Sequence, residues 1–83
     1  MNAGAGFVAA LLRASALGAS RDDPAARSAF QELLATASDD RELADTARAY
    51  AYFLFEQALD PERARAVLDE ARDRLGSGEA TDE

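Results

Sequence analysis

The residues Ala49-Tyr50-Ala51-Tyr52-Phe53-Leu54-Phe55 decide the fold of this chain. They form an unbroken apolar run inside a longer segment whose apolar positions recur every third or fourth residue, a spacing typical of an α-helix. A helix on the surface of a domain carries one apolar stripe, whereas a helix that is apolar around most of its circumference needs neighbours on several sides. The run therefore predicts a central helix with other helices packed around it.

The helix that contains this run is expected to extend from about Arg41 to Leu59. On a helical wheel, Tyr50 lies within the apolar arc and Phe55 lies on its flank, so both are expected in the core. Tyr52 falls on the opposite side, beside charged residues, and is expected near solvent. Phe53 lies at the border between the two sides.

Three further helices are expected over about residues 6–17, 24–37 and 61–75. Two of them begin with an aspartate followed by proline, as Asp22-Asp23-Pro24 and Asp60-Pro61 show. Aspartate is a favoured N-cap residue, and proline is favoured in the first helical turn. The first helix has the weakest signals, because its Ala-Gly-Ala-Gly start has poor helix propensity.

The chain is expected to be all-α, with four antiparallel helices that form two helical hairpins in one domain over residues 1–75. No stretch alternates polar and apolar residues in the manner of a strand, and the chain has two Val and no Ile. Short connections between helices favour antiparallel neighbours. Gly76 is expected to end the last helix, and the small, acidic residues 76–83 are expected to form a disordered tail.

The composition argues against several classes of function. A formal charge of −7 disfavours direct binding to nucleic acid or to anionic lipid. The chain has no His and no Cys, so the usual general base and the most reactive nucleophile are missing, and an enzyme is not expected. No cofactor is indicated.

The apolar residues 3–12 are too few to span a bilayer and resemble no secretory signal, so a soluble, cytoplasmic protein is expected. The chain has 21 Ala, and all nine of its cations are Arg, which suggests a GC-rich bacterial coding bias.

Adjacent carboxylates occur at Asp22-Asp23, Asp39-Asp40 and Asp69-Glu70. A hard cation needs six or more oxygen ligands, and neighbouring residues of a helix do not face one another. The first two pairs stand where helices are expected to begin, so helix capping explains them better than a metal site.

The two halves of the chain resemble each other at an offset of 38 residues. The matching positions are Ala26, Ala29, Phe30 and Leu33 in the first half, and Ala64, Val67, Leu68 and Ala71 in the second. These residues resemble the tetratricopeptide (TPR) family of helical repeats. In that family a small residue of the second helix is followed four positions later by a bulky one, as in Ala26 with Phe30 and Ala64 with Leu68. Phe55 falls where the family usually has an aromatic residue on the first helix.

The resemblance implies two loose repeats, over about residues 7–37 and 41–75, that act as a scaffold for binding proteins or peptides. Family grooves are lined mainly by the first helix of each pair, which places the candidate partner-binding surface on the third helix. Its candidate residues are Thr46, Ala49, Tyr52, Phe53 and Glu56. Two repeats are fewer than such arrays usually need, so a second copy packed on the first helix could supply the missing layer. The candidate oligomer seam consists of Phe7, Val8 and Leu11.

The leading hypothesis is therefore a non-enzymatic adaptor that binds a protein or peptide, with a basic partner favoured by the acidic charge. The alternative is a small acidic inhibitor or immunity-type protein that occupies a basic site on an enzyme or nucleic-acid-binding protein. A third hypothesis is that the chain is one part of a larger assembly. Steep weakening by salt would distinguish the inhibitor from a module that docks through apolar contacts.

Overall fold

The computed structural model describes the backbone of residues 3–79 and the side chains of residues 6–75. It contains four α-helices, and no strand occurs within the described backbone, so the all-α prediction is confirmed. The helices are α1 (Ala3–Ala19), α2 (Asp23–Thr36), α3 (Asp40–Glu56) and α4 (Pro61–Glu79).

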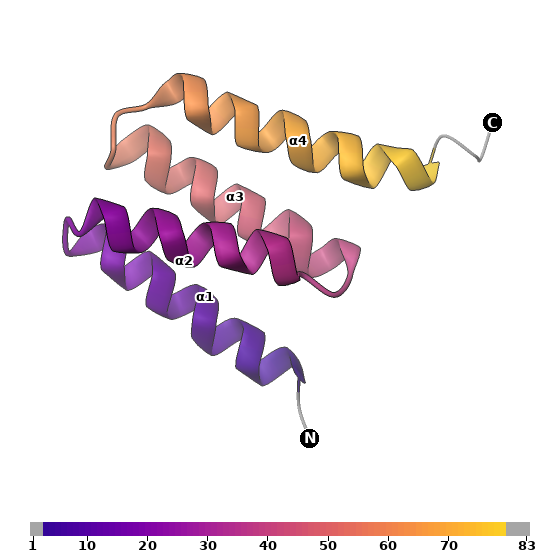
Figure 1. Cartoon of the computed structure of the whole chain (residues 1–83), viewed down its shortest axis with the longest axis horizontal. Helices are drawn as coiled ribbons and strands as arrows, with labels where there is room; N and C mark the ends of the chain where they lie inside the picture. The colour runs from indigo at the N-terminus through magenta and orange to yellow at the C-terminus, as the bar shows by residue number, and fades with distance from the viewer. Residues whose placement is uncertain (1–2, 80–83) are drawn as a thin grey trace.

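The four helices form a flat arrangement in which α3 lies between α2 and α4 (Figure 1). The hairpin α1–α2 and the hairpin α3–α4 each pack closely, and α3 also contacts both α1 and α2. The Cα atoms extend over 43 × 37 × 14 Å, so the molecule is thin in one direction. Because α3 packs against all three other helices, the prediction of a central helix around residues 49–55 is confirmed.

The core is built on three aromatic rings that pack against one another. The ring of Phe30 in α2 lies 5.1 Å from that of Tyr50 and 5.7 Å from that of Phe53, both in α3. Tyr50 and Phe53 are each 2% exposed. The burial expected for Tyr50 is therefore confirmed, and Phe53, which the wheel left at the border, belongs to the core.

Small residues let the helices around these rings approach closely. Ala14, Ala26 and Ala64, one each from α1, α2 and α4, are fully buried. Gly18 in α1 makes the tightest approach, since a Cβ atom there would lie 2.6 Å from Cδ1 of Phe53. Glycine at this position therefore allows α1 to cover the flank of α3 where Phe53 lies.

The first turns of three helices are capped by aspartate, as their positions in the sequence predicted. The side chain of Asp22 accepts a hydrogen bond at 3.4 Å from the backbone amide three residues later. Asp39 and Asp60 do the same, at 2.8 and 3.2 Å. Capping thus accounts for Asp22, Asp39 and Asp60, and Asp23 and Asp40 lie in the first turns, where a negative charge is favourable.

The third helix ends earlier than expected, at Glu56 and not near Leu59. Leu59 has a left-handed backbone conformation with φ of 55°, which terminates the helix. The amide of Asp60 then donates a 2.7 Å hydrogen bond to the carbonyl oxygen of Leu54. This turn redirects the chain into α4.

The outer helices are longer than expected. The first covers residues 3–19 and not 6–17, and it ends in a turn in which Arg21 is left-handed with φ of 68°. The last continues through Gly76 to residue 79, so the predicted stop at Gly76 was wrong. A glycine inside a helix costs only about 1 kcal/mol relative to alanine, which a helix can absorb. The rest of the predicted disordered tail, residues 80–83, lies outside the described residues.

The two halves of the chain differ in how deeply their matching residues are buried. Phe30 is fully buried, whereas Leu68, its counterpart in the second half, is 42% exposed. Phe55 was expected in the core but is 53% exposed. The reason is that α2 packs against both α1 and α3, whereas α4 packs against α3 alone, so side chains on the flanks of the α3–α4 contact have no third helix to cover them.

Candidate functional site

A hollow of about 570 Å³ opens between α1 and α3. It is lined by Leu11 and Ser15 from α1, by Phe30 from α2, and by Asp45, Arg48, Ala49, Tyr52, Phe53 and Gln57 from α3 and its C-terminal end. We call this hollow the α1–α3 groove. Its walls are mostly apolar, with the charged and amide groups at the rim, which is the usual make-up of a binding site.

A smaller hollow of about 340 Å³ lies nearer the start of α3. Phe7 and Val8 line it from α1, and Asp39, Arg41, Glu42 and Asp45 line it from the other side. Because Asp45 lines both hollows, the two adjoin along the same pair of helices. The smaller hollow carries an excess of acidic groups, although Asp39 and Glu42 also serve the start of α3 as capping residues.

The structure brings three of the five candidate partner-binding residues to the α1–α3 groove. Ala49, Tyr52 and Phe53 line it, and Tyr52 is 63% exposed, which confirms that it lies near solvent. Glu56 is exposed but does not line the groove.

Thr46 was expected on an exposed edge and is fully buried, so that expectation was wrong. It lies one helical turn from both Glu42 and Tyr50, on the side of α3 that packs into the fold. Its Oγ1 atom has no hydrogen-bond partner among the described residues. A buried hydroxyl without a partner carries a desolvation cost.

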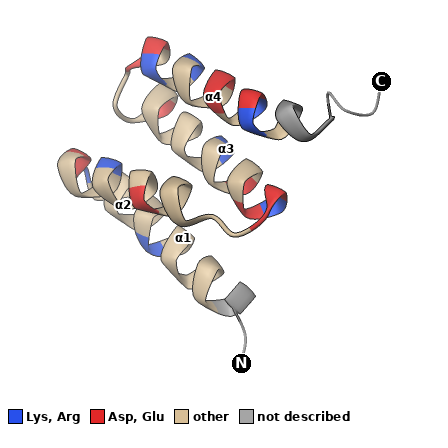
Figure 2. Ribbon diagram, turned by 45° about the vertical axis from the view of Figure 1, so that its right-hand side comes forward, with Lys and Arg blue, Asp and Glu red and all other residues tan. Residues whose placement is uncertain are grey.

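All three residues of the predicted oligomer seam line the hollows beside α3. Phe7 and Leu11 are half-buried, whereas Val8 is 52% exposed. Leu12, which the seam prediction omitted, is 65% exposed. The only charged residue of α1 is Arg13, and Figure 2 shows the helix correspondingly almost free of red and blue.

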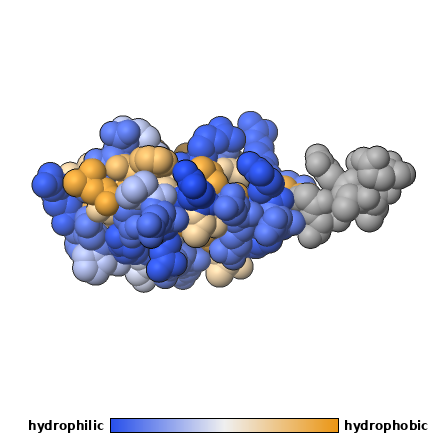
Figure 3. Space-filling view, turned by 90° about the horizontal axis from the view of Figure 1, so that it is seen from above, coloured by the Kyte–Doolittle hydropathy of each residue, from blue (hydrophilic) through white to orange (hydrophobic). Residues whose placement is uncertain are grey.

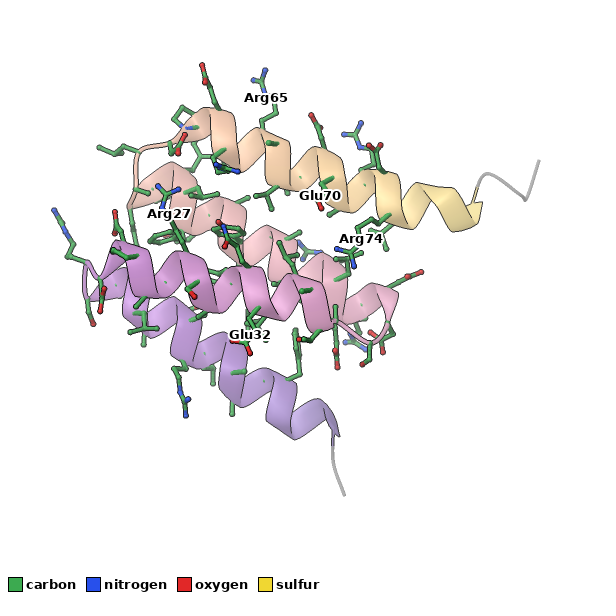
Figure 4. The ribbon with its side chains drawn as sticks, viewed as in Figure 1. Arg27, Glu32, Arg65, Glu70 and Arg74 are labelled. Atoms are coloured by element: carbon green, nitrogen blue, oxygen red, sulfur yellow. The ribbon has the colours of Figure 1, made fainter. Side chains whose placement is uncertain are left out.

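At the opposite edge of the molecule, α4 presents a polar surface. The view onto α4 in Figure 3 is mostly blue, with orange surface gathered towards the end where α3 passes into α4. Arg65 extends outward from this helix, away from α3 (Figure 4). The two outer helices therefore differ: the outward surface of α1 is largely apolar, and that of α4 is charged.

Two arginines link α2 to the second hairpin across α3 (Figure 4). Arg27 forms an ion pair with Asp60 at 3.6 Å, and both side chains are about one third exposed. Arg74 donates from both terminal nitrogens to the carbonyl oxygen of Leu34, each at 3.4 Å. Exposed pairs of this kind contribute little energy, and we interpret both as structural links between the hairpins.

Six lining residues were not predicted for this surface: Leu11, Ser15, Phe30, Asp45, Arg48 and Gln57. Asp45, Arg48 and Gln57 each lie one helical turn from Ala49, Tyr52 or Phe53, so the helical wheel contained the signal for these three. What the wheel lacked was the position of α1, which decides which side of α3 becomes a groove wall.

The described residues contain no group of three or more His, Cys, Asp or Glu that could hold a metal ion. No helix in the described part of the chain is long and apolar enough to cross a membrane. The groove offers apolar and aromatic surface together with a few rim groups that can form hydrogen bonds or ion pairs, so binding is the chemistry it can support.

No protein-family model, curated protein or solved structure matches this chain.

Proposed function

We propose that this chain is a non-enzymatic protein–protein interaction module, a TPR-like adaptor of the bacterial cytoplasm, and that its partner docks in the α1–α3 groove. The observation that carries the proposal is an open, mostly apolar hollow with a 63% exposed tyrosine, Tyr52, at its rim. Tyrosine is among the residues that dominate binding energy at interfaces, because it combines a large apolar surface with a hydroxyl group.

The charge of the chain favours a basic partner. The net charge of −7 creates a field that speeds the approach of a positively charged molecule. Apolar contacts in the groove would then hold the complex together. In this picture the charged rim residues Asp45 and Arg48 set the orientation of the partner more than its affinity.

The experiment is a selection of 16-residue peptides from a phage-displayed random library on the immobilised chain. Selected peptides are then measured by fluorescence anisotropy against the wild type and Tyr52→Glu, with Ala66→Glu as the control. Ala66 is exposed on α4, so this control adds the same charge away from the groove. We expect Tyr52→Glu to lose at least tenfold in affinity and Ala66→Glu to bind like the wild type. A library without binders, or binders equally affected by both variants, would refute the proposal.

The acidic inhibitor is the second candidate, because Asp39, Glu42 and Asp45 gather at the smaller hollow beside the groove. A complex held by these charges would weaken steeply between low and physiological salt, since ions screen exposed charges over about 10 Å. Peptides whose affinity falls more than about tenfold over this range, without loss in Tyr52→Glu, would favour the inhibitor.

The apolar surface of α1 does not by itself support a stable homodimer. Burying the exposed parts of Val8 and Leu12 in two copies would contribute about 4–7 kcal/mol. Association costs roughly 4–15 kcal/mol, which exceeds this contribution over most of its range. The proposed function therefore rests on the groove and not on self-association.

A further inference from the structure

The most exposed large apolar residues of the second hairpin follow one side of α3. Tyr52, Phe55 and Leu59 are 63, 53 and 76% exposed. Tyr52 and Phe55 are three residues apart and so share one side of α3, and Leu59 follows in the left-handed turn after the helix. We call these three residues the α3 stripe. Figure 3 shows apolar surface gathered at the end of the molecule where α3 passes into α4.

Leu59 occupies a position that suits glycine better. Its φ of 55° lies in the left-handed region, where the Cβ atom of any residue other than glycine is crowded by its own backbone. The turn needs this conformation, since it lets the amide of Asp60 reach the carbonyl oxygen of Leu54 at 2.7 Å. Glycine or asparagine would meet that need with less strain.

Nothing inside the fold accounts for leucine at this position. Its side chain is 76% exposed, so it adds little to the core, and it leaves apolar surface in water. Residues kept in strained conformations tend to occur where the side chain has a function. Leu59 combines backbone strain with the largest exposed fraction among the large apolar side chains that the structure describes.

We propose that the α3 stripe docks the apolar face of a positively charged amphipathic helix from a partner protein, and that Leu59 is one of its anchors. This inference rests on the proposed function and specifies the partner for the surface next to the groove, with which the stripe shares Tyr52. An amphipathic helix presents apolar side chains at spacings of three and four residues, so its apolar face fits along the stripe.

The charge of the whole chain favours a positively charged partner. Charges of both signs lie near the stripe: Glu56 and Glu62 are exposed, as are Arg63 and Arg48, one turn before Tyr52, and Asp60 pairs with Arg27. The net charge of −7 therefore sets the sign of the partner's charge. A second copy of this chain would carry the same net charge, which argues against self-association at the stripe.

The test uses two synthetic amphipathic helices of 14 residues that share one leucine-rich apolar face. One carries Lys on its polar face and the other carries Glu. Fluorescence anisotropy against the wild-type chain should show the Lys peptide binding at least tenfold more tightly than the Glu peptide. Equal binding of the two peptides would overturn the stated charge of the partner, and no binding of the Lys peptide would overturn the docking surface.

The decisive variant is Leu59→Gly, and Arg21→Gly is its matched control. Arg21 is also a left-handed residue at a helix end, with φ of 68°, but it lies in the loop between α1 and α2. Both substitutions should raise the midpoint of thermal unfolding by a few degrees, because both relieve the same kind of strain. Leu59→Gly should weaken the binding of the Lys peptide at least fivefold, because the variant has no leucine side chain to bury against the peptide. Arg21→Gly should leave the affinity equal or higher.

The outcomes separate this inference from the proposed function. If Leu59→Gly binds the Lys peptide as the wild type does, the inference fails, whatever Tyr52→Glu does to the library peptides. If sedimentation shows a wild-type dimer that Leu59→Gly abolishes, the stripe docks a second copy and the inference is also overturned. If only the library selection yields no binders, the proposed function is refuted, and the binding of the Lys peptide alone tests docking at the stripe.

Discussion

Replacing Gly18 by alanine tests whether the close approach of α1 to α3 holds the fold together. The added Cβ would lie 2.6 Å from Cδ1 and 3.1 Å from Cε1 of Phe53, and 2.8 Å from Oε1 of Gln57. Ordinary contacts between carbon atoms are about 3.5–4.0 Å, so the ring would have to move by roughly 1 Å. Phe53 is 2% exposed and packs on Phe30 and Tyr50, so such a movement disturbs the whole aromatic core.

The expected loss of stability follows from two opposing effects. Overpacking of a core costs about 1–3 kcal/mol, while alanine in place of glycine gains up to about 1 kcal/mol of helix propensity. Gly18 lies next to the last residue of α1, where the propensity gain is smallest. We therefore expect a net loss of about 1–2 kcal/mol, which lowers the thermal midpoint of a domain this size by roughly 5–15 °C.

The assay is thermal and urea unfolding followed by circular dichroism, with Gly6→Ala as the control. Gly6 lies in the same helix, and a Cβ there would meet nothing within 4 Å, so this variant should be neutral or slightly more stable. If Gly18→Ala proves as stable as Gly6→Ala, α1 does not pack on α3 as described, and the α1–α3 groove loses one of its walls.

Two further predictions concern single polar groups. Thr46→Val should stabilise the fold by about 1 kcal/mol in urea unfolding, because it removes a buried hydroxyl without a partner; a destabilised variant would mean that the hydroxyl has one. Asp39→Ala should cost about 1 kcal/mol, because its carboxylate accepts a 2.8 Å hydrogen bond from the amide of Glu42. Asp22→Ala should cost less in the same experiment, since its bond to the amide of Ala25 is 3.4 Å long, and equal losses would contradict this ranking.

The helical elements could be predicted from the chain because their signals are local. Apolar spacing identified all four helices, and aspartate with proline marked two of their starts. The central position of α3 followed from its apolar run, since only a helix with several neighbours can bury so much of its circumference. The helix ends were less predictable, because a left-handed turn at Leu59 or a glycine inside a helix depends on small energy differences.

The exposure of a candidate-site residue could be predicted only where the residue's position on its own helix decided it. Tyr52 points away from the apolar arc in any packing of α3, so its exposure could be read from the wheel. Thr46 and Phe55 both lie on the flanks of the apolar arc of α3. Thr46 was expected to be exposed and is buried, whereas Phe55 was expected to be buried and is exposed. The wheel gives the direction of a side chain from its own helix, but not where the neighbouring helix lies.

Residues in the amino-acid sequence thus specify the number, class and caps of the helices, because hydrogen bonds and apolar periodicity act over a few positions. The groove and the exposed stripe arise from the packing of α1 and α4 on either side of α3. That packing depends on contacts between residues far apart in the chain, such as Gly18 with Phe53. Since α3 is the only helix on which α4 packs, the flank of α3 that carries Phe55 stays exposed. The local sequence pattern around Phe55 does not indicate that no other helix covers it.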